Sequence, residues 1–194
     1  MYVAGRRVIL QMMVTIDGFV AGPNDEMDWI DNDPVMGEAH SSLAEGADAA
    51  VIGHGVYQGM AQYWPQVAAN PDAPNNEAEF GKLMNDMHKI VVSTKPEDLQ
   101  WTNCEQLLVT GDHDLVQRFT QLKNEPGEYL LLYGGVRTAQ TFIRHNLVDE
   151  YRLDLCPTAL GAGKPLFPER TTLAFVSATP YESGAMTLVY RRAE

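Results

Sequence analysis

The sequence predicts a three-layer α/β/α sandwich whose sheet is mostly parallel and ends in antiparallel strands. Two observations carry this prediction. From residue 8 to residue 146, short apolar runs typical of buried strands alternate with stretches of helical periodicity. After residue 150, three strand-like runs follow one another with no helical pattern between them. Alternating strands and helices give right-handed crossovers and parallel neighbours, whereas consecutive strands pair antiparallel.

The first strand and helix follow from a buried run and a capping pair. Residues 8–14, VILQMMV, form a nearly continuous apolar run that is typical of a strand buried on both faces. Asp33 and Pro34 then predict the start of a helix, because aspartate is a favoured N-cap and proline is tolerated at the first helical position. A second buried strand is expected at 47–53.

The middle of the chain repeats this order. A short helix is expected at 54–63, and residues 64–76 are rich in proline and asparagine, which predicts a loop. Asn76 and Glu79 have the spacing of a capping box, so a further helix is expected to begin there. The apolar run 89–94 predicts the next strand.

The last part of the chain completes the sheet. A strand is expected at 106–111, before a helix that Asp112 caps. A strand at 128–135 ends in two glycines and leads into a helix at 136–146. The three consecutive strands are expected at 150–157, 172–180 and 185–192.

Composition places the chain among ordinary globular proteins and limits its partners. It has 194 residues, of which 45% are hydrophobic and 21% charged, and this fits one domain over residues 1–194. Its 26 acidic and 14 basic residues give a formal charge of −12. Such a field repels nucleic acid and anionic membranes, so a small-molecule substrate is the expected partner.

The N-terminal run and the cysteines predict a cytoplasmic protein. The run breaks at Asp17 and Gly18 without a small-residue cleavage site, which predicts a strand rather than a signal peptide. No stretch approaches the length of a membrane span. Cys104 and Cys156 match no zinc pattern, and two structural thiols are favoured over one disulfide.

Two glycine-rich junctions are candidates for phosphate binding. Gly134 and Gly135 stand where a buried strand opens a helix, an arrangement that suits either a phosphate or a tight turn without a ligand. Gly53, Gly55 and Gly59 stand at a second such junction. Their spacing approaches the dinucleotide fingerprint, but a proline-rich stretch follows in place of a strand with an acidic residue. A Rossmann unit is therefore disfavoured, and another nucleotide-binding turn stays open.

Other patterns argue against hydrolase and metal chemistry. The glycines at 160–165 resemble a P-loop only in part, because Pro165 replaces serine or threonine, so a plain loop is favoured. The acidic stretch 24–33 lacks the spacing of a calcium loop, and a solvated loop is favoured. Glu38, on the following helix, is either a proton donor near a cleft or a solvent-facing residue. The five histidines show no metal-ligand spacing, and no metal site is expected.

Four segments in a fixed order resemble the dihydrofolate reductase superfamily. They are VTIDGFVAG (14–22), IGHGVYQGMAQYWP (52–65), KIVVSTK (89–95) and the long segment from YLLLYGG to GKPLF (129–167). The chain most resembles the reductase domain of the bifunctional deaminase-reductase of riboflavin biosynthesis, in stand-alone form. The deaminase's zinc motif is absent, so the resemblance implies only the reductase half, with a dihydrofolate reductase-like fold.

The resemblance implies a cofactor site for NADPH, with NADH possible. Glycines and helix N–H groups would hold the pyrophosphate, and polar side chains would lie beside the adenosine ribose and its 2′-phosphate. The implied pyrophosphate residues are Gly134, Gly135, Val136, Arg137 and Thr138; the implied ribose residues are Ser93, Thr94 and Lys95; the other wall runs from Gly53 to Val56. The chain departs from the family at His54 and Val56, where relatives usually carry arginine and threonine.

The resemblance also implies hydride transfer to a C=N or C=O bond of a pteridine or pyrimidine substrate, as in 5-amino-6-(5-phosphoribosylamino)uracil reductase or dihydrofolate reductase. Asp17 and Glu38 are the implied catalytic residues, and Tyr57 and Trp64 would line the substrate side. Family members commonly pair, which implies a homodimer. The alternative is a non-catalytic nucleotide-binding or ligand-sensing dimer that retains the fold.

Overall fold

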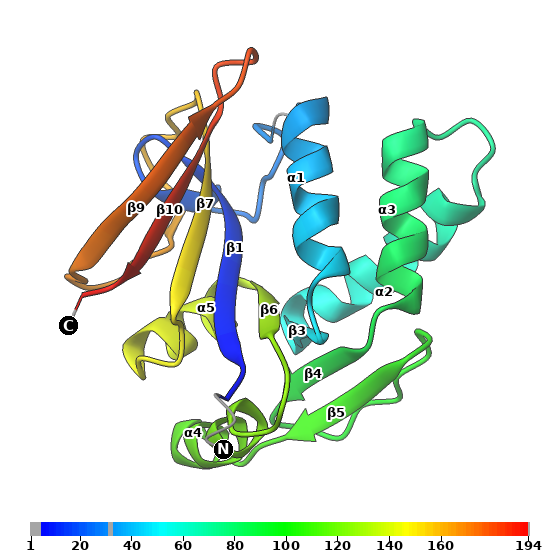
Figure 1. Cartoon of the computed structure of the whole chain (residues 1–194), viewed down its shortest axis with the longest axis vertical. Helices are drawn as coiled ribbons and strands as arrows, with labels where there is room; N and C mark the ends of the chain where they lie inside the picture. Colours follow the sequence, from blue (N-terminus) through cyan, green and yellow to red (C-terminus); the bar gives the residue numbers. More distant parts are fainter. Residues whose placement is uncertain (1–4, 31–32, 194) are drawn as a thin grey trace.

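A computed structural model of the chain describes residues 5–30 and 33–193. Its centre is an eight-stranded sheet (Figure 1). The strands are β1 (Arg7–Thr15), β3 (Ala49–Gly53), β4 (Lys89–Ser93), β5 (Cys104–Leu108), β6 (Tyr129–Gly134), β7 (Glu150–Cys156), β9 (Leu173–Pro180) and β10 (Met186–Arg192). Their order across the sheet is β5-β4-β3-β6-β1-β7-β10-β9.

Strand directions confirm the predicted fold class. Every neighbouring pair from β5 to β7 is parallel, whereas β10 runs antiparallel to both β7 and β9. β1 lies at the middle of this arrangement, with Leu10 opposite both Leu132 of β6 and Tyr151 of β7. The carboxyl ends of the parallel strands therefore share one edge of the sheet.

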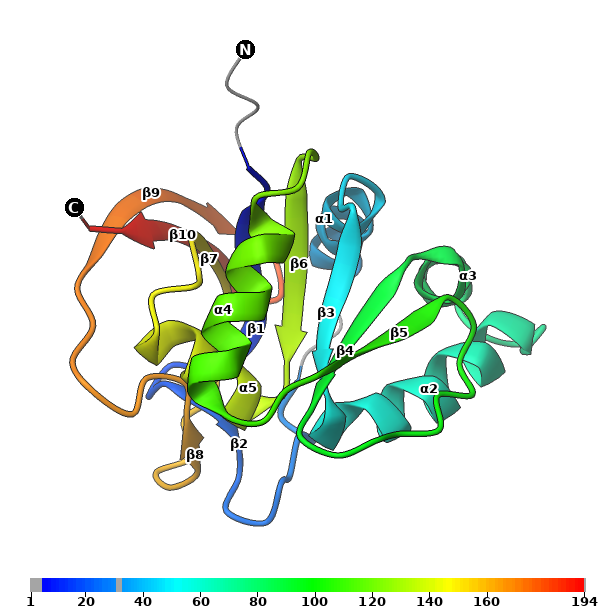
Figure 2. The ribbon, with the colours of Figure 1, turned by 90° about the horizontal axis from the view of Figure 1, so that it is seen from below.

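Helices cover both faces of the sheet and complete three layers (Figure 2). α1 (Pro34–Glu45), α2 (His54–Ala69) and α3 (Asn75–Asp86) cover one face. α4 (Asp112–Lys123) and α5 (Val136–Arg144) cover the other. Alternate strand residues face the two layers: Val8 and Leu10 pack against α4 and α5, and Ile9 packs on the α1 side. Within the described ranges, no helix is both long and apolar enough to cross a membrane.

The start of α1 confirms the predicted cap. The Asp33 carboxylate accepts the backbone N–H groups of Val35 and Met36 at 2.9 and 3.1 Å, and Pro34 begins the helix. The bond from Met36 is the main cause that lowers the pKa of Asp33, and a hydrogen bond from Ser183 adds to it. Asp33 therefore ties α1 to the turn between β9 and β10.

α2 is longer than its sequence predicts, and the loop expected at 64–69 is wrong. The helix continues through Pro65 to Ala69. Trp64 makes edge-to-face contacts with Tyr63 and with Phe80 of α3, each with ring centroids 4.9 Å apart. This aromatic packing between α2 and α3 outweighs the local preference of proline for a break.

Two predicted caps are wrong. The Asn76–Glu79 capping box does not form, because α3 begins at Asn75 behind Pro74, which has no side-chain cap. Asp112 lies inside the first turn of α4, whose N-cap is Gly111. The Asp114 carboxylate accepts the backbone N–H of Thr110, the residue before this N-cap, at 2.8 Å.

Two features of the strands also differ from the prediction. β5 begins at Cys104 rather than 106, because the buried Trp101 anchors the preceding chain through its Nε1 bond of 2.7 Å to Asn85. The sequence gives no sign of β2 (Phe19–Ala21) and β8 (Lys164–Pro165), which form a separate two-stranded sheet. This small sheet joins the turn after β1 to the glycine-rich loop after β7.

Candidate active site

Two strand-to-helix junctions lie side by side at the carboxyl edge of the sheet. β3 ends at Gly53 and β6 ends at Gly134, and these strands are parallel neighbours. α2 and α5 begin directly after them, on opposite faces. Within the described chain, the N-caps Gly53 and Gly135 provide no side-chain hydrogen bond to either helix. The first N–H groups of both helices can therefore bind a phosphate, which the helix dipoles also favour.

Glycines shape this pair of junctions. Gly134 and Gly135 have φ of 73° and 67°, a left-handed conformation that favours glycine. A Cβ on Gly53 would collide with the Thr138 side chain and lie 2.9 Å from the Gly134 carbonyl oxygen, so the two junctions pack against each other. Gly55, in the first turn of α2, differs, because a Cβ there would meet no described heavy atom within 4 Å. Open space therefore lies at the N-terminal end of α2.

A polar cluster lies at the end of β4, next to β3. The Ser93 hydroxyl donates to the Lys95 carbonyl oxygen at 2.8 Å and lies 3.3 Å from Glu97 Oε1. His54, the first residue of α2, places Nδ1 3.0 Å from the same Glu97 oxygen. Thr94 and Lys95 are exposed beside them. The implied ribose residues therefore share this edge with a carboxylate.

A row of polar side chains crosses the face of the sheet that α1 covers. It comprises Tyr133 on β6, Gln11 on β1, Asp154 on β7 and His40 on α1, and we call these four residues the polar row. β1 pairs with both β6 and β7, so the first three lie on adjacent strands. Gln11 Nε2 donates to Asp154 Oδ2 at 3.5 Å, and His40 Nε2 lies 2.9 Å from the same oxygen.

Two atoms of the polar row, Gln11 Oε1 and Tyr133 OH, are buried without a hydrogen-bond partner among the described residues. Burial raises the pKa of Tyr133, so its phenol stays neutral and keeps a proton to donate. An unpaired buried polar atom costs about 1–3 kcal/mol, so two of them on adjacent strands indicate a place for a ligand or ordered water. One offers an acceptor and the other a donor, which suits the edge of a heterocycle.

Asp154 and His40 form the ionisable part of the polar row. The Asp154 side chain is 1% exposed, and His40 is its only ionic partner in the described ranges. Its other oxygen accepts from the Thr187 hydroxyl at 2.5 Å. A carboxylate bonded to one imidazole nitrogen fixes the ring's orientation and leaves the second nitrogen for another partner. This pair can hold a proton and deliver it to a substrate.

Asp17, an implied catalytic residue, holds a loop in place. Its carboxylate accepts the Thr15 hydroxyl at 2.5 Å and the backbone N–H groups of Leu160 and Gly161 at 3.3 and 2.8 Å. The bond from Thr15 is the main cause that lowers the pKa of Asp17, and the Gly161 bond adds to it. This geometry favours a positioning role, since an ionised carboxylate has no proton to donate.

The other implied substrate-side residues lie apart from the polar row. Glu38 is exposed on α1, whereas His40 is half-buried. Tyr57 is buried, and its hydroxyl accepts the Trp101 backbone N–H at 3.1 Å. Trp64 packs α2 against α3, as described above. The structure thus brings together the implied cofactor residues around Gly53, Ser93 and Gly134, but not these three side chains.

Sequence reasoning missed the polar row and Glu97. Gln11 is the one polar residue in the buried run VILQMMV, and Asp154 stands between two leucines of a strand. Polar residues at buried strand positions are a signal that a sequence alone offers. His40 and Asp154 are 114 residues apart, so only the fold reveals their pairing.

The chain has relatives of matching length in Bacillus subtilis (strain 168). It is 36% identical over 188 residues to the uncharacterized protein YyaP, covering 95% of this chain and 94% of YyaP. It is 25% identical over 192 residues to the uncharacterized protein YwjB, covering 97% and 99% of the two chains.

Solved structures share the fold. A putative riboflavin biosynthesis protein from Shewanella sp. PV-4 has a TM-score of 0.65 at 18% identity, covering 97% of this chain and 99% of that one. Dihydrofolate reductase from Enterococcus faecalis, complexed with NADP(H), has a TM-score of 0.61 at 13% identity over the whole of both chains.

A third structure is a diaminohydroxyphosphoribosylaminopyrimidine deaminase/5-amino-6-(5-phosphoribosylamino)uracil reductase from Thermotoga maritima, with a TM-score of 0.66 at 14% identity. The match covers 97% of this chain and 57% of that longer one. The RibD C-terminal domain family matches residues 6–187, nearly the whole chain. The parallel sheet, the glycine junctions and this match lead to one conclusion: the chain, which shares the fold of dihydrofolate reductase, belongs to the RibD C-terminal domain family.

Proposed function

We propose that this protein is a nicotinamide-dependent reductase that transfers a hydride to a C=N or C=O bond of a pteridine or pyrimidine compound. One observation carries the proposal. Two glycine-capped helix N-termini meet beside a polar row in which two buried atoms have no hydrogen-bond partner among the described residues. The first feature suits a dinucleotide's phosphates and the second suits a polar heterocycle.

The residues at the helix ends fit the diphosphate of a nicotinamide dinucleotide. The backbone N–H groups of Val136 and Arg137 belong to the free first turn of α5. The open space at Gly55 leaves room for phosphate oxygens at the start of α2. Arg137 is exposed and adds a positive charge to an acidic protein. When bound, the reduced nicotinamide supplies the hydride.

The polar row fits the substrate side of the reaction. Gln11 Oε1 can accept from a ring N–H, and Tyr133 OH can donate to a ring nitrogen or carbonyl oxygen. Reduction of C=N or C=O needs a hydride on carbon and a proton on nitrogen or oxygen. His40, held by Asp154, is the residue we assign as the proton donor. The buried strands around it would exclude water from the reacting atoms.

The descriptions of two solved structures with the same fold support the same chemistry. The Thermotoga maritima structure is described as a deaminase/reductase, and the Enterococcus faecalis one as a dihydrofolate reductase complexed with NADP(H). Reduction is the activity common to these two descriptions, and the second of them names a nicotinamide cofactor.

The test is a titration followed by turnover. Purified protein is titrated with NADH and with NADPH, and binding is followed by nicotinamide fluorescence. Loss of nicotinamide absorbance is then measured with dihydrofolate, dihydropterins and ribitylaminopyrimidines. The proposal predicts saturable binding and turnover with at least one ring class. Binding without turnover on any of them would favour the ligand-sensing alternative, and no binding of either dinucleotide would overturn the cofactor assignment.

A further inference from the structure

Glu97 stands at the point where three elements of the cofactor edge meet. Its carboxylate contacts His54 at the start of α2 and the Ser93 hydroxyl at the end of β4. Its backbone N–H donates to the Gln106 side chain of β5 at 3.2 Å. The Glu97 side chain is only 18% exposed, so the carboxylate is held in one place rather than extended into solvent.

The two ends of a dinucleotide at this edge would meet different surroundings. On the β1 side of the phosphate-binding helix ends lies the buried polar row, which suits the reacting ring and the substrate. On the β4 side lie the exposed Thr94 and Lys95 and the carboxylate of Glu97. A nucleoside that takes no part in the chemistry belongs on this open side. Its ribose would therefore lie against the end of β4, next to Glu97.

A carboxylate at that place discriminates between the two nicotinamide cofactors. It accepts hydrogen bonds from a free ribose diol, whereas it repels a 2′-phosphate that carries up to two negative charges. In Rossmann domains an acidic residue near the ribose accompanies NAD and an arginine accompanies NADP; this chain has a different fold, but the same charge preference applies at a ribose site. Lys95 is the only cation of segment 93–98, and its side chain is exposed.

We propose that Glu97 selects NADH over NADPH by accepting the ribose 2′-hydroxyl of the unphosphorylated cofactor. The proposal rests on the proposed function above, and it reverses the cofactor preference that the family resemblance implies. Ser93 and His54 act as positioning residues, because each donates to or contacts the Glu97 carboxylate.

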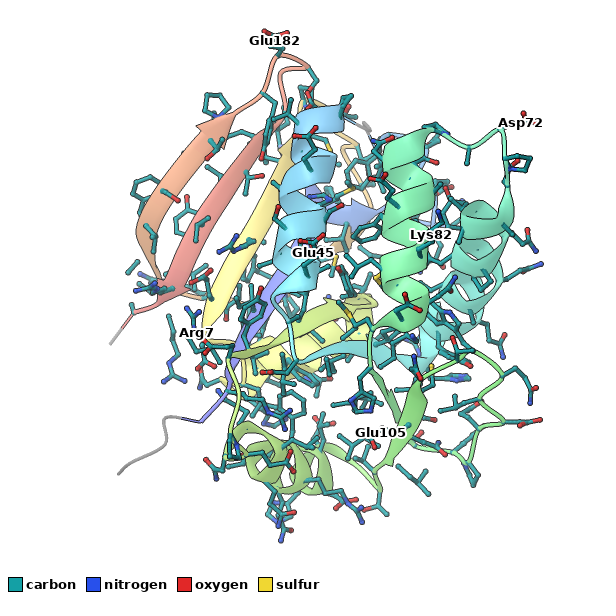
Figure 3. The ribbon with its side chains drawn as sticks, turned by 45° about the vertical axis from the view of Figure 1, so that its right-hand side comes forward. Arg7, Glu45, Asp72, Lys82, Glu105 and Glu182 are labelled. Atoms are coloured by element: carbon teal, nitrogen blue, oxygen red, sulfur yellow. The ribbon has the colours of Figure 1, made fainter. Side chains whose placement is uncertain are left out.

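The experiment measures the dissociation constants of NADH and NADPH for wild type, Glu97→Gln and Glu105→Gln. Wild type is expected to bind NADH at least about tenfold more tightly, a difference of about 1.4 kcal/mol. Glu97→Gln should shift the ratio toward NADPH by about fivefold or more, mainly by tightening NADPH. Glu105→Gln is the matched control. It removes the same charge from a second histidine–glutamate pair, in which Glu105 lies 3.5 Å from His88. This pair lies toward the amino end of β4 and β5, and Figure 3 labels Glu105. Its ratio should equal that of wild type.

The outcomes separate this inference from the proposed function. Equal or tighter NADPH binding by wild type would overturn the role of Glu97, even if the variant failed to fold. An unchanged ratio in a folded Glu97→Gln protein, or an equal shift in both variants, would overturn it as well. Failure of wild type to bind either dinucleotide would instead contradict the proposed function.

Discussion

Replacing Gly55 by alanine should stabilise the protein and weaken its cofactor binding at the same time. Gly55 lies in the first turn of α2, and its φ is not in the left-handed region. Alanine is favoured over glycine within a helix by about 0.5–1 kcal/mol. For a chain of this length, such a gain raises the melting temperature by roughly 1–4 °C.

The same methyl group would occupy the space that a diphosphate needs. Apart from its chain neighbours and the backbone of its own helix, no described heavy atom lies within 4 Å of it, so the fold loses nothing. In the complex, phosphate oxygens bonded to the helix N–H groups would lie about 2.9 Å from the backbone nitrogens and would meet the methyl carbon. Overpacking of this kind costs about 1–3 kcal/mol, which corresponds to a dissociation constant that is about five- to 150-fold larger.

Gly59→Ala provides the matched control. Gly59 lies in the same helix, and a Cβ there would also meet no described heavy atom within 4 Å, but it stands about one turn farther from the helix end. It should show the same stabilisation with unchanged binding. Thermal unfolding and fluorescence titration of both variants make the comparison. If Gly55→Ala bound the cofactor as tightly as wild type, the proposed phosphate site at the start of α2 would be refuted. Equal losses of cofactor affinity in both variants would refute it as well.

Gly135 is a poorer place for this test. Its φ of 67° strains any L side chain, and a Cβ there would lie 3.2 Å from Val56 Cγ1. If Gly135→Val lost binding, a blocked approach of the phosphate could not be distinguished from a disturbed strand-to-helix junction.

Three further predictions concern other parts of the molecule. His40→Gln keeps a donor for Asp154 but cannot release a proton, so turnover should fall about 10²-fold or more while the cofactor dissociation constant stays unchanged. Phe175 is 63% exposed on edge strand β9 and should lie in a homodimer interface. Phe175→Asp should therefore convert a dimer to a monomer in sedimentation equilibrium. A monomeric wild type would contradict this expectation. The pKa of Asp33 is lower in the folded protein than in the unfolded chain, where it is about 3.9. Ionised Asp33 therefore stabilises the fold above that pH, and this stabilisation is lost as the pH falls through the folded-state pKa. Asp33→Asn, which still caps α1, should therefore lose less stability between pH 7 and pH 3 in urea titrations.

The fold was predictable because its signals are local. Strand-helix alternation, followed by three strands in succession, is enough to predict a parallel sheet with an antiparallel edge. The errors arose where tertiary contacts outweigh local preference. Trp64 and Phe80 hold Pro65 inside a helix, and Trp101 sets where β5 begins.

The candidate site was predictable only in part. Gly53 and Gly134 are recognisable because each stands between a strand and a helix, and the sheet then brings the two together. The pairs His40–Asp154 and His54–Glu97 have no local pattern, since their members come from distant segments. Side-chain direction also decides roles: Glu38 and His40 are two positions apart on α1, yet only His40 reaches the buried carboxylate.

The central claim is that a dinucleotide lies across the ends of β3 and β6 with its nicotinamide toward the polar row. A crystal structure of the protein with bound NADH tests this directly. The account predicts diphosphate oxygens about 2.7–3.2 Å from the backbone nitrogens of Val136 and Arg137. It predicts the nicotinamide on the β1 side, near Tyr133 and Gln11, and the adenosine ribose beside Glu97. A dinucleotide bound in the reverse direction, or away from these helix ends, would contradict the account.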